Sequence, residues 1–330
     1  MRRWIATLVL AVAAIGPAAL ANDSAAEMAA GGLVLKQSRD IDMVSEDLYV
    51  SAQEIRVRYV FRNRAPRDVR TIVAFPMPEL DLAREEESDV SWPGDFRTRI
   101  DGHDVSMAVE RRAVLNGVDH TALLAELGVT LSGHEDAAPM YRSVEALAAP
   151  AQNRLARLGL VRIWNEPGAG RHANPLWTVR ETWHWEQVFP AGRDLVVEHR
   201  YRPGTGGTVS TALTIPEMRG SDYGREQIAR YCIDQRFLRA LDRLAAQMPD
   251  EIVNIDEQWV SYILTTGANW RSPIADFRLV VDKGSPQNLV SFCGEGVRRI
   301  SPTQFELRRR NWRPDRNLHV LILRPSGAAD

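Results

Sequence analysis

The residues that could do chemistry begin with an aromatic segment at residues 177–189. Apolar and polar residues alternate here, which predicts a β-strand with Trp177, Trp183 and Trp185 on one face and His184 on the other. Exposed aromatic rings can stack on sugars, so Trp183, His184 and Trp185 are a candidate binding set for a glycan or peptidoglycan. The alternative is that the rings point inward and pack between two β-sheets.

Two further segments place polar groups near the predicted strands. Asn269, Trp270 and Arg271 follow Gly267 near a strand end, where the tryptophan and arginine could contact a ligand or could anchor a domain interface. In the segment 198–200, His199 lies between a glutamate and an arginine. It could serve as a general base only if a nucleophile lay opposite, and otherwise it is a structural histidine.

Metal sites and familiar catalytic motifs are weakly indicated. His134, Glu135 and Asp136, with His120 nearby, could ligate a transition metal, and the acidic run 85–89 could hold calcium. Both segments are also typical of solvated loops. The sequence contains no Gly-x-Ser-x-Gly, His-Glu-x-x-His or Gly-x-x-x-x-Gly-Lys motif. We therefore predict no catalytic residues, no metal and no cofactor, although a catalytic set assembled from distant segments remains open.

Cys232 and Cys293 are the only cysteines of the chain. An even pair in an oxidising compartment most simply forms one disulfide bond. In the chain-entropy model, closing a loop of about 60 residues contributes on the order of 4 kcal/mol, so a structural role suffices. We predict this bridge.

The N-terminal residues predict an export signal. Arg2 and Arg3 precede a short apolar stretch, and the segment 19–21 has the small-x-small pattern of a cleavage site. The apolar stretch is shorter than the roughly 20 residues that span a bilayer. We predict a signal peptide at residues 1–21, cleavage after Ala21, a periplasmic protein and no later transmembrane segment. The formal net charge of −2 argues against a nucleic-acid partner.

The elements that must position these residues are mostly strands. At residues 55–62 apolar residues alternate with arginines, which predicts a strand with one buried and one basic face. Asp101 and Gly102 predict a hairpin turn. A capping-box pattern from Ser24 to Glu27 predicts a short helix, and the segment 225–248 predicts a longer one with Cys232 on its buried face.

The predicted fold class is therefore mainly β (α+β). We expect two antiparallel β-sandwich-like domains, with a helical insertion in the first and a helix packed on the second. The expected ranges are 22–220 for the N-terminal domain, about 111–163 for the insertion and 221–330 for the C-terminal domain, which contains the disulfide.

Several motifs resemble those of an exported bacterial family known only as domain of unknown function 4424. They cover nearly the whole chain after residue 21: Asn22-Asp23-Ser24, Met43-Val44-Ser45-Glu46-Asp47-Leu48-Tyr49, Phe75-Pro76-Met77-Pro78, Phe189-Pro190-Ala191-Gly192 and Tyr262-Ile263-Leu264-Thr265-Thr266-Gly267-Ala268-Asn269-Trp270. The resemblance implies the envelope compartment and the architecture, and it supplies no catalytic residues.

These observations favour a non-enzymatic envelope protein that binds a protein or glycan partner. Two alternatives stay open: a periplasmic hydrolase that acts on cell-wall or polysaccharide material, and a structural accessory of an envelope assembly. A pocket with clustered carboxylates of raised pKa would favour the enzyme. An exposed sheet edge or apolar patch would favour a protein partner.

Overall fold

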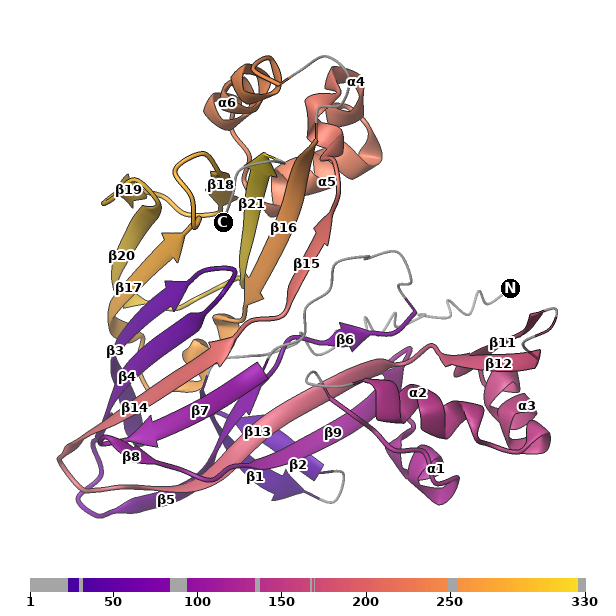
Figure 1. Ribbon diagram of the computed structural model, residues 1–330. Coiled ribbons are helices and arrows are strands. Elements are labelled where there is room, and N and C mark those ends of the chain that lie inside the picture. The colour runs from indigo at the N-terminus through magenta and orange to yellow at the C-terminus, as the bar shows by residue number, and fades with distance from the viewer. Residues whose placement is uncertain are drawn as a thin grey trace, which may run out of the picture.

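The computed structural model describes residues 23–29, 32–83, 94–133, 137–166, 168, 170–248 and 254–325. Its elements are mostly strands arranged in several antiparallel sheets, which confirms the predicted mainly β class (Figure 1). Within these ranges no helix is long and apolar enough to span a membrane. The predicted signal peptide lies outside the described residues.

The first large sheet has seven strands, all paired antiparallel. Its members are β10 (Val118–Asp119), β9 (Ala108–Leu115), β13 (Thr178–Phe189), β5 (Val69–Pro76), β1 (Ser24–Ala29) and β2 (Gly32–Lys36), with β6 (Leu80–Asp81) paired to β13. The helix predicted at Ser24 is wrong, because β1 occupies the position between β5 and β2. Ala25 pairs with Val73 on one side and Lys36 on the other, and this ladder outweighs the local capping signature.

The second large sheet has eight strands, which come from both halves of the sequence. In order they are β19 (Arg298–Arg299), β20 (Gln304–Trp312), β17 (Ile274–Asp282), β3 (Ile41–Val50), β4 (Ile55–Asn63), β14 (Asp194–Arg202), β7 (Gly94–Ile100) and β8 (His103–Asp104). Only the β17–β3 pair is parallel. That pair joins segments from both sides of the predicted boundary at residue 220, so the two halves share one sheet. The division into domains stays a prediction.

The residues of this sheet alternate as the sequence predicts. On β4, Ile55, Val57, Tyr59 and Phe61 are all buried, and the arginines between them point outward. The hairpin at Asp101 and Gly102 is confirmed: both residues have positive φ, and they join β7 to β8.

The main core lies between the inner faces of the sheets. It includes Phe75 and Trp185 from the seven-stranded sheet, Tyr59 and Phe61 from the eight-stranded sheet, and Tyr262 from a third sheet. Fully burying a large apolar side chain contributes about 1.5–3 kcal/mol, so this aromatic interior is a major source of stability. It also fixes the strands that carry the outward-facing side chains.

The insertion forms a smaller body at one end of the molecule (Figure 1). It contains α1 (Thr121–Glu126), α2 (Ala138–Glu145), α3 (Ala149–Arg157) and the hairpin β11 (Val161–Glu166) and β12 (Gly170–Pro175). Its core is separate from the main one and includes Trp177, Met140 and Leu155. The helices begin later than the sequence pattern suggests, because residues 111–115 continue β9 against β13.

The third sheet has four strands: β15 (Thr205–Thr208), β16 (Ile255–Tyr262), β21 (Leu318–Pro325) and β18 (Leu289–Phe292). The short helices near it are η1 (Ala212–Thr214), α4 (Pro216–Arg219), α5 (Asp222–Arg230), α6 (Gln235–Ala245) and η2 (Thr265–Asn269). Leu238 and Leu241 of α6 are buried in one cluster with Leu321 and Leu323 of β21. The single helix predicted over residues 225–248 is therefore two helices, α5 and α6, separated by a turn at Cys232, and α6 packs on the C-terminal strands.

The Cys232–Cys293 disulfide is present, with an S–S distance of 2.07 Å. The prediction that Cys232 lies on the buried face of a helix is wrong. Helix α5 ends at Arg230, and Cys232 lies beyond it with φ of 51° and an exposed side chain. Tyr231 and Ile233 on either side point inward instead, so the bridge ties the loop after α5 to the end of β18.

Candidate functional site

The tryptophans of the predicted binding strand belong mainly to the cores. Trp177 is 0% exposed and Trp185 is 4% exposed, and the Trp185 indole donates a hydrogen bond to Gln187. Trp183 is half-buried and its ring stacks on Phe96 at 5.4 Å. His184 is half-buried on the opposite face of β13. Rings enclosed in this way offer no face to a sugar, so the packing alternative accounts for Trp177 and Trp185.

The segment 269–271 anchors the N-terminal strand. The Trp270 indole is fully buried and donates to the Asp23 carbonyl oxygen at 2.9 Å. The Asn269 amide donates to Ser24 Oγ at 3.0 Å. The interior position of Trp270 corrects the hypothesis that this side chain meets a ligand, and it fits the anchoring alternative.

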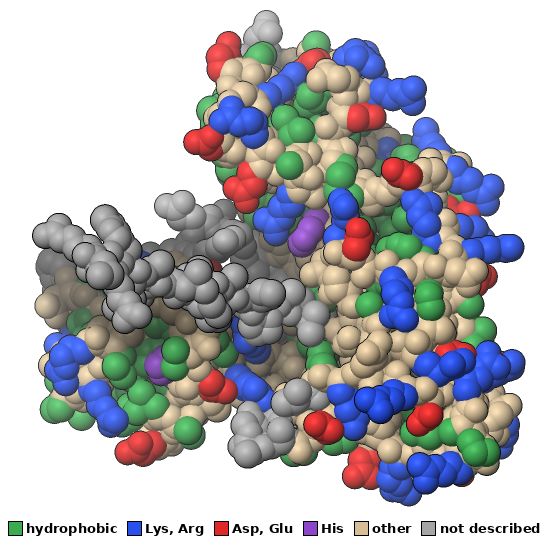
Figure 2. All heavy atoms as spheres, turned by 180° about the vertical axis from the view of Figure 1, so that it is seen from behind, with side chains coloured by type: hydrophobic (Ala, Val, Ile, Leu, Met, Phe, Trp, Pro, Cys, Tyr) green, Lys and Arg blue, Asp and Glu red, His purple; other side chains and the backbone are tan. Residues whose placement is uncertain are grey.

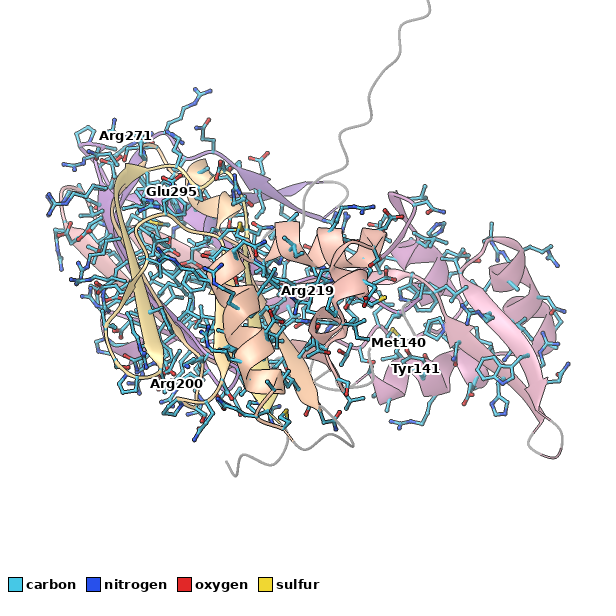
Figure 3. The ribbon with its side chains drawn as sticks, turned by 90° about the horizontal axis from the view of Figure 1, so that it is seen from above. Met140, Tyr141, Arg200, Arg219, Arg271 and Glu295 are labelled. Atoms are coloured by element: carbon cyan, nitrogen blue, oxygen red, sulfur yellow. A yellow bond between two sulfur atoms is a disulfide. The ribbon has the colours of Figure 1, made fainter. Side chains whose placement is uncertain are left out.

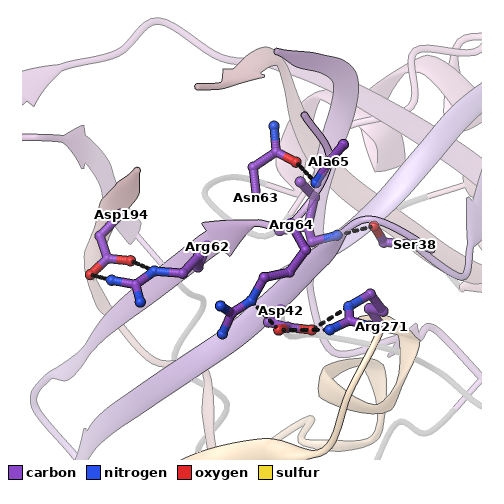
Figure 4. Close-up of polar contacts among 9 residues, drawn as sticks. Ser38, Asp42, Arg62, Asn63, Arg64, Ala65, Asp194 and Arg271 are labelled. Atoms are coloured by element: carbon purple, nitrogen blue, oxygen red, sulfur yellow. Dashed lines mark hydrogen bonds and ion pairs between the residues drawn. The ribbon is translucent and has the colours of Figure 1, made fainter. Parts of the chain in front are cut away.

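Arg271 contacts a different strand, at the rim of the eight-stranded sheet. Its guanidinium Nε donates to Asp42 Oδ1 at 2.8 Å, and Arg64 donates to the other oxygen at 2.7 Å (Figure 4). Burial alone would raise the pKa of Asp42, but the hydrogen bonds from Arg271 and Arg64 outweigh it and lower that pKa. This pairing fastens the loop after η2 to the start of β3.

A buried polar array lies on the inner face of the eight-stranded sheet. His199 Nε2 is 3.0 Å from Asp23 Oδ1, and His199 Nδ1 is 2.7 Å from Thr98 Oγ1. Complete burial raises the pKa of Asp23, and His199 opposes that shift only in part. The register places Thr98 directly opposite His199 on the neighbouring strand. A hydroxyl does therefore lie opposite the histidine.

The array has the order of a nucleophile, base and acid, but its surroundings are those of a core. The His199 and Asp23 side chains are both 0% exposed. The rings of Phe75 and Phe96 lie 5.0 and 5.3 Å from the imidazole. General base catalysis requires a substrate within hydrogen-bond reach, and these rings occupy that space. The array instead holds the N-terminal strand against β14.

The outer face of the same sheet carries an open cavity of about 840 Å³, with charged side chains from β3, β4, β7, β8, β14 and β17 in its lining. Figure 2 shows Lys and Arg side chains gathered along the side of the molecule that this sheet forms, with acidic side chains between them. Figure 3 places Arg200 at the sheet end of the molecule, far from Met140 and Tyr141 in the insertion. The volume lies within the range of small-ligand sites. We take this cavity as the candidate site.

One row of side chains across the cavity alternates in charge. In strand order the row is Arg278, Asp47, Arg58, Glu198, Arg99 and Asp104, each directly opposite the next. Arg99 Nε lies 2.7 Å from Asp104 and Arg278 lies 3.0 Å from Asp47. The hydrogen bond from Arg99 lowers the pKa of Asp104. This charge ladder neutralises itself, as favourable cross-strand pairs do.

The adjacent row is predominantly basic. Arg56 pairs in register with Arg200, which pairs with Arg97, so three arginines stand side by side on three strands. Glu54 forms ion pairs with both Arg56 and Arg200. Among the described carboxylates none forms an ion pair with Arg97. Like charges opposite one another destabilise a sheet, so this arginine row has a feature that folding alone does not require.

Tyr49 closes one end of the arginine row. The Arg56 guanidinium lies 4.4 Å from the centre of its ring, a cation–π contact that fixes both side chains. A smaller cavity of about 360 Å³ shares Arg97 and Arg200 with the row and also has Glu54, Asp95 and Arg202 in its lining. The charged surface therefore extends from the arginine row along the strands toward their ends.

Among the described residues, no three His, Cys, Asp or Glu side chains cluster as metal ligands would. The acidic run 85–89 and the segment 134–136 lie outside the described residues. The arginine row and the charge ladder were missed as a site from sequence. The alternating arginines of residues 55–62 were the one signal that pointed toward them.

The fold and the site define a mainly β protein that presents a hollowed, charged sheet face. Residues 21–321 match the family described as "Domain of unknown function (DUF4424)", and the chain belongs to that family. No curated protein matches the sequence. A crystal structure of a "putative nutrient binding protein" from Legionella pneumophila is similar at 14% identity and a TM-score of 0.45, and the match covers 92% of this chain and 70% of that one.

Proposed function

We propose that this protein is a non-enzymatic binding protein of the bacterial envelope, which recognises a glycan or protein partner with the outer face of its eight-stranded sheet. The observation that carries the proposal is the 840 Å³ cavity on that face. Its charged lining projects from strands whose opposite faces are locked in the main core. A site on such rigid elements is preorganised for a ligand.

Binding suits the chemistry of this cavity better than hydrolysis. Much of its charged lining consists of arginines and carboxylates that pair with one another, as Arg278 does with Asp47. In the one described array that resembles a catalytic set, His199 and Thr98 border the cavity, but the His199 and Asp23 side chains are fully buried and aromatic rings pack against the imidazole. The charged side chains supply hydrogen-bond donors and acceptors to a ligand that lies across the strands.

The envelope compartment is part of the proposal. The disulfide between Cys232 and Cys293 suits an oxidising compartment. Residues 1–21 have the pattern of a signal peptide, and the protein is expected in the periplasm with Asn22 as its first residue. N-terminal sequencing of the protein from a periplasmic fraction tests this. A chain that stays in the cytoplasm, or begins at residue 1, contradicts it.

The binding function is tested by screening the exported protein against envelope glycans and against periplasmic proteins. A true ligand should lose at least tenfold in affinity on Arg58→Glu, which reverses a charge in the middle of the ladder. Arg70→Glu is the matched control, because Arg70 is an exposed arginine on the other large sheet. Equal affinity of both variants places the ligand elsewhere and overturns the proposal. Turnover of a bound glycan would establish the hydrolase alternative.

A further inference from the structure

We infer that the arginine row formed by Arg56, Arg200 and Arg97 recognises the carboxylate groups of an acidic oligosaccharide. The inference rests on the proposed function, because it names the class of ligand for the same cavity. All three side chains are exposed and line that cavity. They come from three adjacent strands, β4, β14 and β7.

The contrast between the two neighbouring rows is the first argument. In the charge ladder every arginine faces a carboxylate, so no ligand charge is needed there. In the arginine row Glu54 pairs with Arg56 and with Arg200, and Arg97 has no ion pair with a described carboxylate. Adjacent strands are about 4.8 Å apart, at which distance like charges repel. An anion between these arginines would relieve the repulsion.

The geometry of the row suits carboxylates. A guanidinium presents a planar fork of N–H donors that matches the two oxygens of a carboxylate. The Tyr49 ring holds Arg56 in place at 4.4 Å, so less rotamer freedom is lost on binding. The three arginines come from adjacent strands, whose spacing of about 4.8 Å is close to the length of one sugar ring. A chain of sugars laid across the strands can therefore meet successive arginines.

The charge ladder argues for a sugar over a more densely charged polymer. Asp47 and Glu198 line the same cavity as the arginine row. Carboxylates would repel a polyphosphate or a nucleic acid, whose charges are closely spaced. They accept hydrogen bonds from sugar hydroxyls, and the ladder arginines donate to hydroxyl and ring oxygens. One row therefore suits the acidic groups and the other suits the hydroxyls of one ligand.

The test uses tetragalacturonate, its carboxyl-reduced form, a phosphorylated oligosaccharide and a glutamate-rich peptide, with calorimetry on the exported protein. Tetragalacturonate should bind, and its affinity should fall about 10- to 100-fold on Arg97→Gln or Arg200→Gln, the range for a lost charge-assisted hydrogen bond. The reduced sugar should bind at least tenfold more weakly than the acidic one. Raising the salt concentration should lower the affinity for tetragalacturonate and leave the affinity for its carboxyl-reduced form unchanged.

The matched control is Arg70→Gln, which removes an exposed arginine outside the cavity and should leave the affinity unchanged. Equal affinity for the acidic and reduced sugars, or for the parent protein and Arg97→Gln, overturns the inference. So does tighter binding of the phosphorylated sugar or the peptide. If the affinity for one of these ligands still falls on Arg58→Glu, the proposed function stands and only the ligand class is wrong. If none of the four ligands binds, the inference fails, while the proposed function is decided separately by its own screen.

Discussion

The two faces of the eight-stranded sheet carry opposite kinds of chemistry on the same strands. On β14, His199 points into the core and meets Asp23 and Thr98, whereas Glu198 and Arg200 point outward into the cavity. The polar groups inside have few partners, and their side chains are fully buried. Those outside have many partners and solvent around them.

This difference indicates which face stabilises the fold and which face is available for binding. Removing one partner from a buried polar pair leaves the other without hydrogen bonds, and the fold loses stability. Exposed ion pairs contribute little to folding, so their arrangement is free to serve recognition. Changes on the inner face should therefore affect stability, and changes on the outer face should affect binding.

The largest effect is expected for Trp270→Ala on the inner side. The substitution removes a fully buried ring that lies 4.5 Å from Phe61 and leaves the Asp23 carbonyl oxygen without its donor. We expect the free energy of unfolding to fall by about 4 kcal/mol, measured by urea denaturation with the disulfide intact. Trp164→Ala is the matched control, because Trp164 is 38% exposed in the insertion. If Trp270→Ala and Trp164→Ala lowered the free energy of unfolding by similar amounts, the special role of the inner face in stability would be contradicted.

The next effect is expected at the buried array. His199→Ala leaves the Asp23 carboxyl buried without its partner, and we expect a loss of about 3 kcal/mol at pH 7. Burial raises the pKa of Asp23, so the carboxyl becomes neutral as the pH falls and the loss should shrink toward pH 4. The double variant Asp23→Asn with His199→Ala should recover part of the stability at pH 7. A loss independent of pH and of Asp23 would contradict the coupling.

The sequence predicted features that depend on near neighbours. The alternation of β4, the hairpin at Asp101 and the mainly β class follow from local periodicity and turn chemistry. The predicted helix at Ser24 failed because β1 is fixed by pairing with the next strand, β2, and with the more distant β5. The arginine row was out of reach for the same reason, since it exists only through the register that brings Arg97 and Arg200 beside Arg56.

A smaller effect is expected at Glu306 on β20, which tests whether an outer-face carboxylate enclosed by arginines behaves like an inner one. Hydrogen bonds from Arg278 first, and also from Arg298 and Arg308, lower its pKa from 4.5 to about 2. A depressed pKa stabilises the fold above about pH 4.5, and this contribution is lost as the pH falls toward 2.

Because Arg298 and Arg308 are exposed, solvent screens these pairs. We therefore expect Glu306→Gln to lower the free energy of unfolding by about 1–2 kcal/mol at pH 7. The difference from the parent protein should narrow when both are measured near pH 3. A difference that grows on acidification would mean that another group, and not this carboxylate, carries the pH dependence.

The smallest effect on stability is expected for Arg58→Ala in the middle of the charge ladder. The Arg58 side chain is 50% exposed and its Nε lies 3.7 Å from Glu198, so the pair should contribute less than about 1 kcal/mol. The same change removes donors from the cavity, and we expect the affinity for a bound ligand to fall by about tenfold. Urea denaturation and calorimetry on one preparation measure both quantities. If stability fell and affinity held, the outer face would be structural like the inner one, and the contrast between the two faces would fail.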